Sequence, residues 1–113
     1  MKIWQRSKEL SVEIYLLTKN FPSNEQFGLI SQTQRAAISI PSNIAEGSSR
    51  NTKKDFLRFL NIAKGSSFEL ETQLIIASDL GYINTEVSLD IVSKIQELQN
   101  MFHGFIQMLE NKS

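Results

Sequence analysis

The sequence predicts an all-α protein, an antiparallel up-down-up-down four-helix bundle built as one domain over residues 1–113. Three observations support this prediction. Apolar residues recur at steps of three and four in four segments, which is the spacing of one helix face. Short joints separate the segments, and short joints favour antiparallel neighbours. No stretch of useful length alternates apolar and polar residues as a half-buried strand does.

The first helix is predicted over residues 3–20 and the second over residues 24–46. Pro22 follows the first helix, and Ser23 with Gln26 three residues later predicts a capping box that starts the second. The inward face of the first helix comprises Ile3, Leu10, Ile14, Leu17 and Phe21. The inward face of the second comprises Phe27, Ile30, Ala37, Ile44 and Ala45.

Pro41 lies inside the predicted second helix. Proline has no backbone N–H, so it removes one helical hydrogen bond and should bend the helix. The cost is about 3 kcal/mol unless another group compensates. The structure must therefore contain a compensating contact or a kink at this position.

The third helix is predicted over residues 53–80 and the fourth over residues 86–110. Thr52 with Asp55 predicts the start of the third helix, and Gly81 predicts its end. Asn84 and Thr85 can cap the fourth helix. The third helix has an inward stripe at Phe56, Phe59, Leu60, Ala63, Leu70, Leu74 and Ala77. The fourth has one at Val87, Ile91, Ile95, Leu98, Phe102, Phe105 and Leu109.

Further apolar residues flank the main stripe of the fourth helix, namely Val92, Met101, Ile106 and Met108. The resulting apolar arc is wider than one bundle core requires, which favours a subunit interface on this helix. The alternative is that these side chains are ordinary core or scattered surface residues.

Composition limits the classes of function. Twelve Lys and Arg balance twelve Asp and Glu, so any attraction to nucleic acid must be local. The absence of cysteine removes disulfides, thiolate metal sites and cysteine nucleophiles. The first residues lack the apolar core of a signal peptide, and no stretch approaches the roughly 20 apolar residues of a membrane span. A cytoplasmic protein without a membrane partner is therefore expected.

Residues 34–50 carry a polar stripe on one side of the predicted second helix. Its functional interpretation is a line of contacts to a ligand or RNA, and its structural interpretation is a hydrogen-bonded network to a neighbouring helix, which we favour. Glu69 is predicted to pair with Arg35 or Arg50, the alternative being a solvated carboxylate. Gly65, at about 1 kcal/mol less favourable than Ala inside a helix, predicts close packing or backbone access. The predicted network comprises Arg35, Ser39, Asn43, Glu46, Arg50, Ser66 and Glu69.

Basic residues gather where the third helix begins, at Arg50, Lys53, Lys54, Arg58 and Lys64. They fall on one broad arc opposite the apolar stripe, so they reach solvent together. Such faces commonly only solvate a helix. Contact with nucleic acid or an acidic partner is the other interpretation, with Arg35 in support, because assembly of several copies would repeat the patch.

No catalytic, cofactor or metal site is predicted. The single histidine, His103, has Asn100 three residues before it, so the Glu-x-x-His motif of bundle metal sites is missing. His103 also lies off the apolar stripe, which predicts a surface position. No local acidic residue orients it for a triad, and Gly65-Ser66-Ser67 lacks the flanking residues of a phosphate-binding loop. The chain is therefore predicted not to be an enzyme.

A set of short motifs occurs along the chain, at Gln34 to Ala37, Ser39 to Gly47, Arg50, Phe59-Leu60, Ala63, Gly65-Ser66, Glu69-Leu70 and Leu80-Gly81-Tyr82. Together they resemble the bacterial four-helix-bundle proteins encoded by intervening sequences of 23S rRNA genes. The likeness covers nearly the whole chain, although Gln34 stands where this family often has a second arginine.

The resemblance implies a bundle that assembles as a ring, commonly a pentamer. It also implies kinship to accessory proteins of diversity-generating retroelements, which bind nucleic acid and a reverse transcriptase. It implies no settled activity for the family.

Two functional hypotheses follow, with an enzyme that uses an unrecognised cofactor as a distant third. The first is a homo-oligomeric module that binds structured RNA or other nucleic acid through its basic face. The second is a purely structural or protein-binding ring without a nucleic-acid role. The salt dependence of binding distinguishes the first two hypotheses. Phosphate contacts weaken steeply with added salt, whereas an apolar interface does not.

Overall fold

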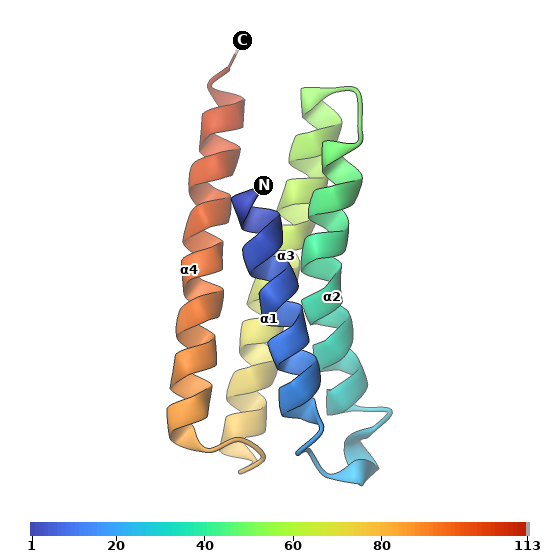
Figure 1. Ribbon diagram of the computed structural model, residues 1–113, viewed down its shortest axis with the longest axis vertical. Helices are drawn as coiled ribbons and strands as arrows, with labels where there is room; N and C mark the ends of the chain where they lie inside the picture. The colour runs from blue at the N-terminus through green and yellow to red at the C-terminus, as the bar shows by residue number, and fades with distance from the viewer. Residues whose placement is uncertain (113) are drawn as a thin grey trace.

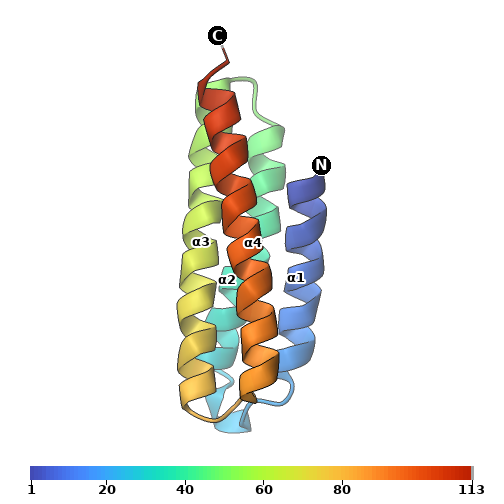
Figure 2. The same ribbon diagram turned by 90° about the vertical axis from the view of Figure 1, so that its left-hand side faces the viewer.

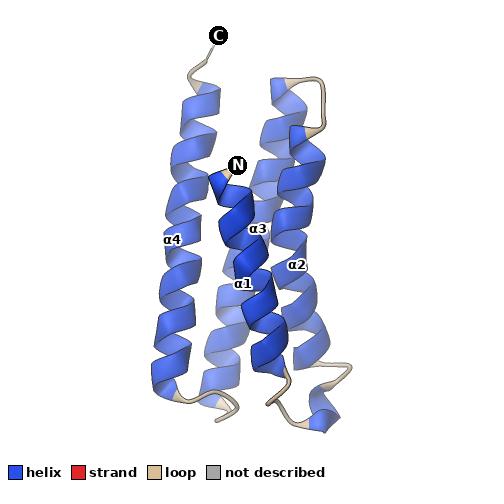
Figure 3. Cartoon of the chain, in the orientation of Figure 1, coloured by secondary structure: helices blue, strands red, loops and turns tan. Residues whose placement is uncertain are grey.

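The computed structural model describes residues 1–112 and contains four long helices in an up-down-up-down bundle (Figure 1). They are α1 (Lys2–Thr18), α2 (Leu29–Ser48), α3 (Lys53–Asp79) and α4 (Thr85–Glu110). A short 3-10 helix, η1 (Ser23–Glu25), lies between α1 and α2. Within the described part of the chain there is no strand (Figure 3). The predicted all-α bundle is confirmed.

Each helix packs beside its neighbour in sequence, and α4 also packs against α1. Helices α1 and α3 lie diagonally opposite each other without direct contact. Figure 2 shows α4 in front, with α3 and α1 on either side. The bundle is a slim cylinder with extents of 49 × 24 × 18 Å.

The predicted caps of α3 and α4 are present. The Thr52 side chain accepts a hydrogen bond from the Asp55 backbone N–H at 3.1 Å. The Asn84 side chain accepts one from the Val87 N–H at 2.8 Å. Gly81 adopts a φ of 81°, a left-handed conformation that glycine adopts without steric cost. Local sequence therefore determines the start and end of α3 and the start of α4.

The predicted start of the second helix at residue 24 is wrong. Ser23 begins η1 and makes no side-chain cap, and α2 begins only at Leu29. The Glu25 carboxylate accepts the Leu29 N–H at 3.2 Å and so satisfies one free donor at the start of α2. As a result, Phe27 lies in the connecting turn with 92% of its surface exposed, not in the core as predicted.

Pro41 is buried within α2, which continues through it to Ser48. Its missing N–H would leave the Ala37 carbonyl without a helical donor. The Ser11 hydroxyl of α1 donates to that carbonyl at 2.9 Å. The same hydroxyl lies 3.0 Å from the Ser7 carbonyl, which the helix itself can satisfy through the Ser11 N–H. Ser11 thus supplies the compensation that Pro41 requires.

We expect Ser11→Ala to lower the free energy of unfolding by about 1 kcal/mol, because it leaves the buried Ala37 carbonyl unpaired. Urea unfolding measures this cost. Ser7→Ala is the matched control, since Ser7 is also buried but donates only to the Trp4 carbonyl of its own helix. Introduced together with Pro41→Ala, which restores a helical donor, Ser11→Ala should cost less. Equal costs in both backgrounds would contradict the proposed compensation.

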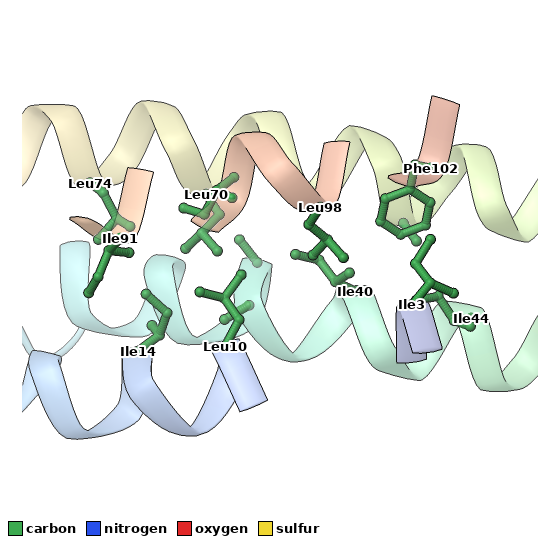
Figure 4. Close-up of a cluster of buried hydrophobic side chains, with 14 of the residues drawn as sticks. Ile3, Leu10, Ile14, Ile40, Ile44, Leu70, Leu74, Ile91, Leu98 and Phe102 are labelled. Carbon is green, nitrogen blue, oxygen red and sulfur yellow. The ribbon is translucent and has the colours of Figure 1, made fainter. Parts of the chain in front are cut away.

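The core runs along the axis of the bundle and contains aliphatic residues from all four helices (Figure 4). Its largest fully buried side chain is Phe102 of α4. Most of the predicted inward residues of α3 and α4 are buried. Those fully enclosed in these two helices are Leu60, Ala63, Leu70, Leu74, Ala77, Ile95 and Phe102.

Candidate nucleic-acid interface and polar network

A hydrogen-bonded network joins α2 to α3 at the centre of the predicted polar stripe. The hydroxyls of Ser39 and Ser66 lie 2.9 Å apart. The Asn43 side-chain amide donates to the Ser39 carbonyl at 2.8 Å and to its hydroxyl at 2.9 Å. Because these groups are half-buried and satisfy one another, this part of the stripe acts between helices.

The outer part of the stripe remains exposed. Arg35 and Ser42 of α2 both reach solvent. Arg50 pairs with Glu46 one turn earlier, at 3.2 Å. Within residues 1–112, Glu69 has no cationic partner within 4.0 Å, so its predicted pairing with Arg35 or Arg50 is wrong for a single chain.

Two arginines flank one aromatic ring at the end of the bundle. The guanidinium carbon of Arg58 lies 4.4 Å from the centroid of the Phe59 ring, and that of Arg50 lies 5.0 Å from it. Both arginines are exposed, at 58% and 43% of their side-chain surface. Cation–π contacts of this kind hold guanidinium groups in place while their N–H donors face solvent. We call Arg50, Arg58 and Phe59 the arginine cluster.

The other predicted basic residues are more widely scattered along the bundle. The Lys53 ammonium donates to the Lys112 carbonyl, which turns it toward the end of α4. Lys54 is exposed, and Lys64 is half-buried. Arg35 lies fifteen residues before Arg50, which is about 22 Å along a helix axis. The arginine cluster and Lys54 are therefore the compact part of the predicted basic face.

Carboxylates moderate the charge of this end. Asp55 lies 3.9 Å from the Arg58 guanidinium, and Glu46 pairs with Arg50. Both pairs are exposed, so they are worth little to stability and can exchange for a stronger anion. Arg50, Lys53, Lys54 and Arg58 carry four positive charges here, against the two carboxylates of Glu46 and Asp55. The local charge is therefore positive, although the whole chain is neutral.

The predicted subunit interface on α4 is partly wrong. Ile106 is buried in the core at 8% exposure. Val92 is half-buried, and Met101 packs against the core beside α1. Only Met108 is well exposed, at 46%. The wide apolar arc of α4 therefore mostly serves its own bundle.

Sequence analysis missed a more exposed apolar surface on α1. Val12, Tyr15 and Leu16 have 56%, 41% and 56% of their surface in solvent. Ile38 of α2 lies beside them at 48%. The signal was present, because Val12 and Leu16 fall on the side of α1 opposite to its core stripe.

Two long-range polar contacts help to close the bundle and shift pKa values. The hydrogen bond that Lys94 of α4 donates to Glu13 of α1, at 2.7 Å, raises the pKa of Lys94 above its ordinary value of 10.5. The hydrogen bond from the Tyr82 hydroxyl to Glu25, at 2.9 Å, raises the pKa of Tyr82 above 10.0. The first contact joins the interior of α4 to α1, and the second joins the turn between α3 and α4 to η1, so both belong to the framework of the bundle.

His103 is exposed on α4, as its position off the stripe predicts. Over residues 1–112, no three His, Asp or Glu side chains gather in a way that could hold a metal ion. None of the helices in that range is long and apolar enough to cross a membrane.

Comparison with known proteins identifies the relatives of this bundle. The family model described as 23S rRNA-intervening sequence protein matches residues 1–104. A crystal structure of a protein of unknown function from the S23 ribosomal protein family of Bacteroides thetaiotaomicron VPI-5482 superposes with a TM-score of 0.83 and 27% identity. The alignment covers 92% of this chain and 97% of that one. No curated protein matches. The resemblance predicted from the motifs is confirmed, and the chain belongs to the 23S rRNA-intervening sequence protein family.

Proposed function

We propose that this protein is a non-enzymatic, self-assembling module that binds structured RNA or a similar nucleic acid through the arginine cluster. The observation that carries the proposal is the pair of exposed guanidinium groups held on Phe59. Guanidinium groups bind phosphate oxygens in a bidentate manner and stack on bases, so a fixed pair offers two adjacent contacts to a nucleic-acid backbone.

Self-assembly would raise the affinity of the arginine cluster for nucleic acid. A neutral chain exerts no long-range attraction on a polyanion, and a single cluster of a few charges binds weakly. Several copies in one ring would present the arginine cluster repeatedly at the same end, and simultaneous contacts raise the overall affinity. The large exposed apolar surface supports assembly.

The test is fluorescence anisotropy with a labelled fragment of structured 23S rRNA, measured at about 50 and about 200 mM salt. We expect affinity to fall steeply between the two concentrations. Arg50→Gln combined with Arg58→Gln should weaken binding about tenfold or more, since charged hydrogen bonds are lost at each contact. The same double change should flatten the salt dependence.

Arg35→Gln is the comparison variant, because it removes one positive charge from α2 roughly 20 Å along its axis from the end nearest the arginine cluster. A site confined to the arginine cluster predicts little loss of affinity for this variant. An equal loss would extend the site along the face shared by α2 and α3. Absence of RNA binding at both salt concentrations would refute the nucleic-acid role and favour a structural or protein-binding ring.

A further inference from the structure

The face formed by α1 and α2 contains an apolar groove that its own chain leaves open. Val12, Tyr15 and Leu16 of α1 and Ile38 of α2 line it, within a space of about 510 Å³. Lys8 and Lys19 stand toward its two ends, and no acidic residue lines it. We call this surface the α1–α2 groove.

A ridge on α3 carries negative charges where the α1–α2 groove carries positive ones. Five exposed residues follow one another at steps of three and four, so they form one line along the helix. Ile76, 45% exposed, is its apolar member, and carboxylates stand on both sides of Ile76 along the line. The residues of this α3 ridge are Gly65, Glu69, Thr72, Ile76 and Asp79.

Gly65 does not pack closely against other parts of its own bundle. A Cβ atom built at this position meets no heavy atom within 4 Å, so the predicted close packing does not occur inside the bundle. Glycine nevertheless weakens the middle of a helix relative to alanine. An exposed glycine in a helix leaves room for another backbone to approach closely, and Gly65 does so on the α3 ridge.

The charges of the two surfaces have matching spacing. Lys8 and Lys19 are eleven residues apart on α1, which is about 16 Å, and Glu69 and Asp79 are ten residues apart on α3, which is about 15 Å. Throughout residues 1–112, none of these four side chains has an ion-pair partner. The Lys8 ammonium lies 5.4 Å from the centroid of the Trp4 ring, and all four side chains are exposed, so each can form an ion pair with a second molecule.

The heights of the charges along the bundle also agree. The contacts of Ser11 with Ala37 and of Ser39 with Ser66 relate α1 to α3 through α2. They place Ser11 at about the level of residue 68, and α1 and α3 run in the same direction (Figure 1). If copies stand side by side with parallel axes, each lysine lies within about one helical turn of a carboxylate.

We propose that the α3 ridge of one copy packs into the α1–α2 groove of the next copy. Ile76 enters the apolar floor of the groove, Lys8 approaches Glu69, and Lys19 approaches Asp79. Because α1 and α3 are diagonally opposite, a chain cannot fill its own groove. The contact is head-to-tail, and such contacts form a ring where the rotation between copies closes and a filament where it does not. This inference rests on the proposed self-assembly and specifies its surfaces.

Charge reversal tests the pairing, with light scattering at several protein concentrations and no nucleic acid present. The groove variant is Lys8→Glu with Lys19→Glu, and the ridge variant is Glu69→Lys with Asp79→Lys. Each alone should raise the concentration needed for assembly about tenfold or more, because like charges then face each other. Combining all four changes in one chain should restore assembly. Mixing the groove variant with the ridge variant should restore contacts between unlike copies, because opposite charges again face each other there.

Two controls separate the interface from general effects. Reversal of the exposed α4 carboxylates by Glu86→Lys with Glu110→Lys should leave assembly unchanged. Gly65→Leu should weaken assembly about tenfold or more, whereas Gly104→Leu should not, although both glycines lie in helices with no heavy atom near a built Cβ. Circular dichroism confirms that each variant is folded.

If the wild-type protein assembles but the variant with all four charge reversals does not, this pairing of surfaces is wrong. Equal effects of Gly65→Leu and Gly104→Leu would overturn it too. Neither result changes RNA binding by the arginine cluster, which is measured separately by anisotropy. A wild-type protein that stays monomeric would overturn both the pairing and the proposed self-assembly.

Discussion

Replacing Phe102 by alanine should lower the free energy of unfolding by about 3–5 kcal/mol. Phe102 is fully buried in α4, in the same cluster as Ile3 of α1 and Ile44 of α2 (Figure 4). Its removal leaves a cavity where three helices meet. The direct ion pairs between α1 and α4, Arg6 with Glu97 and Lys94 with Glu13, are exposed and cannot compensate.

Urea unfolding followed by circular dichroism measures the effect. Phe102→Leu is the graded control, because it retains much of the apolar volume and should cost clearly less. Phe27→Ala is the negative control, because Phe27 is 92% exposed and its loss should change stability by no more than about 0.5 kcal/mol. A Phe102→Ala protein as stable as the Phe27→Ala protein would contradict the core described above.

Helical periodicity predicted the fold class because it requires only local information. The caps at Thr52 and Asn84 were equally predictable, since each depends on residues three positions apart. The start of α2 was not. Ser23 and Gln26 have the sequence of a capping box, but the Glu25 carboxylate binds the Leu29 N–H and moves the start of the helix five residues later than predicted.

Contacts between helices were harder to predict than helices. The predicted network contained both Ser39 and Ser66 but did not specify that their hydroxyls pair with each other. Instead of pairing with Glu69, Arg50 in the loop after α2 pairs with Glu46 of α2. Ile106 was assigned to a surface because a single projection of α4 does not show how much of the helix its neighbours cover.

The arginine cluster also depends on contacts between elements that periodicity does not predict. Sequence analysis grouped Arg50 and Arg58 by charge alone. Phe59, which it placed in the apolar stripe, is only half-buried and carries both guanidinium groups on its ring. Predicting this arrangement requires the position of the loop between α2 and α3, which periodicity does not provide.

Replacing Gly47 by alanine should lower the free energy of unfolding by about 1–3 kcal/mol. A Cβ atom at this position would lie 2.7 Å from the Phe59 Cβ and 3.0 Å from the Phe56 ring. The Phe59 Cβ is attached directly to the backbone of α3, so the clash cannot be relieved by rotating a flexible side chain. Helices α2 and α3 must move apart, which loosens packing at the end that carries the arginine cluster.

Gly104→Ala is the matched control for Gly47→Ala, because a Cβ at residue 104 meets no heavy atom within 4 Å. Higher helix propensity should make that variant more stable by about 1 kcal/mol. Urea unfolding of the two variants should therefore shift in opposite directions. If Gly47→Ala also stabilised the protein, Gly47 would not be a packing residue. The close approach of α2 to α3 would then need another explanation.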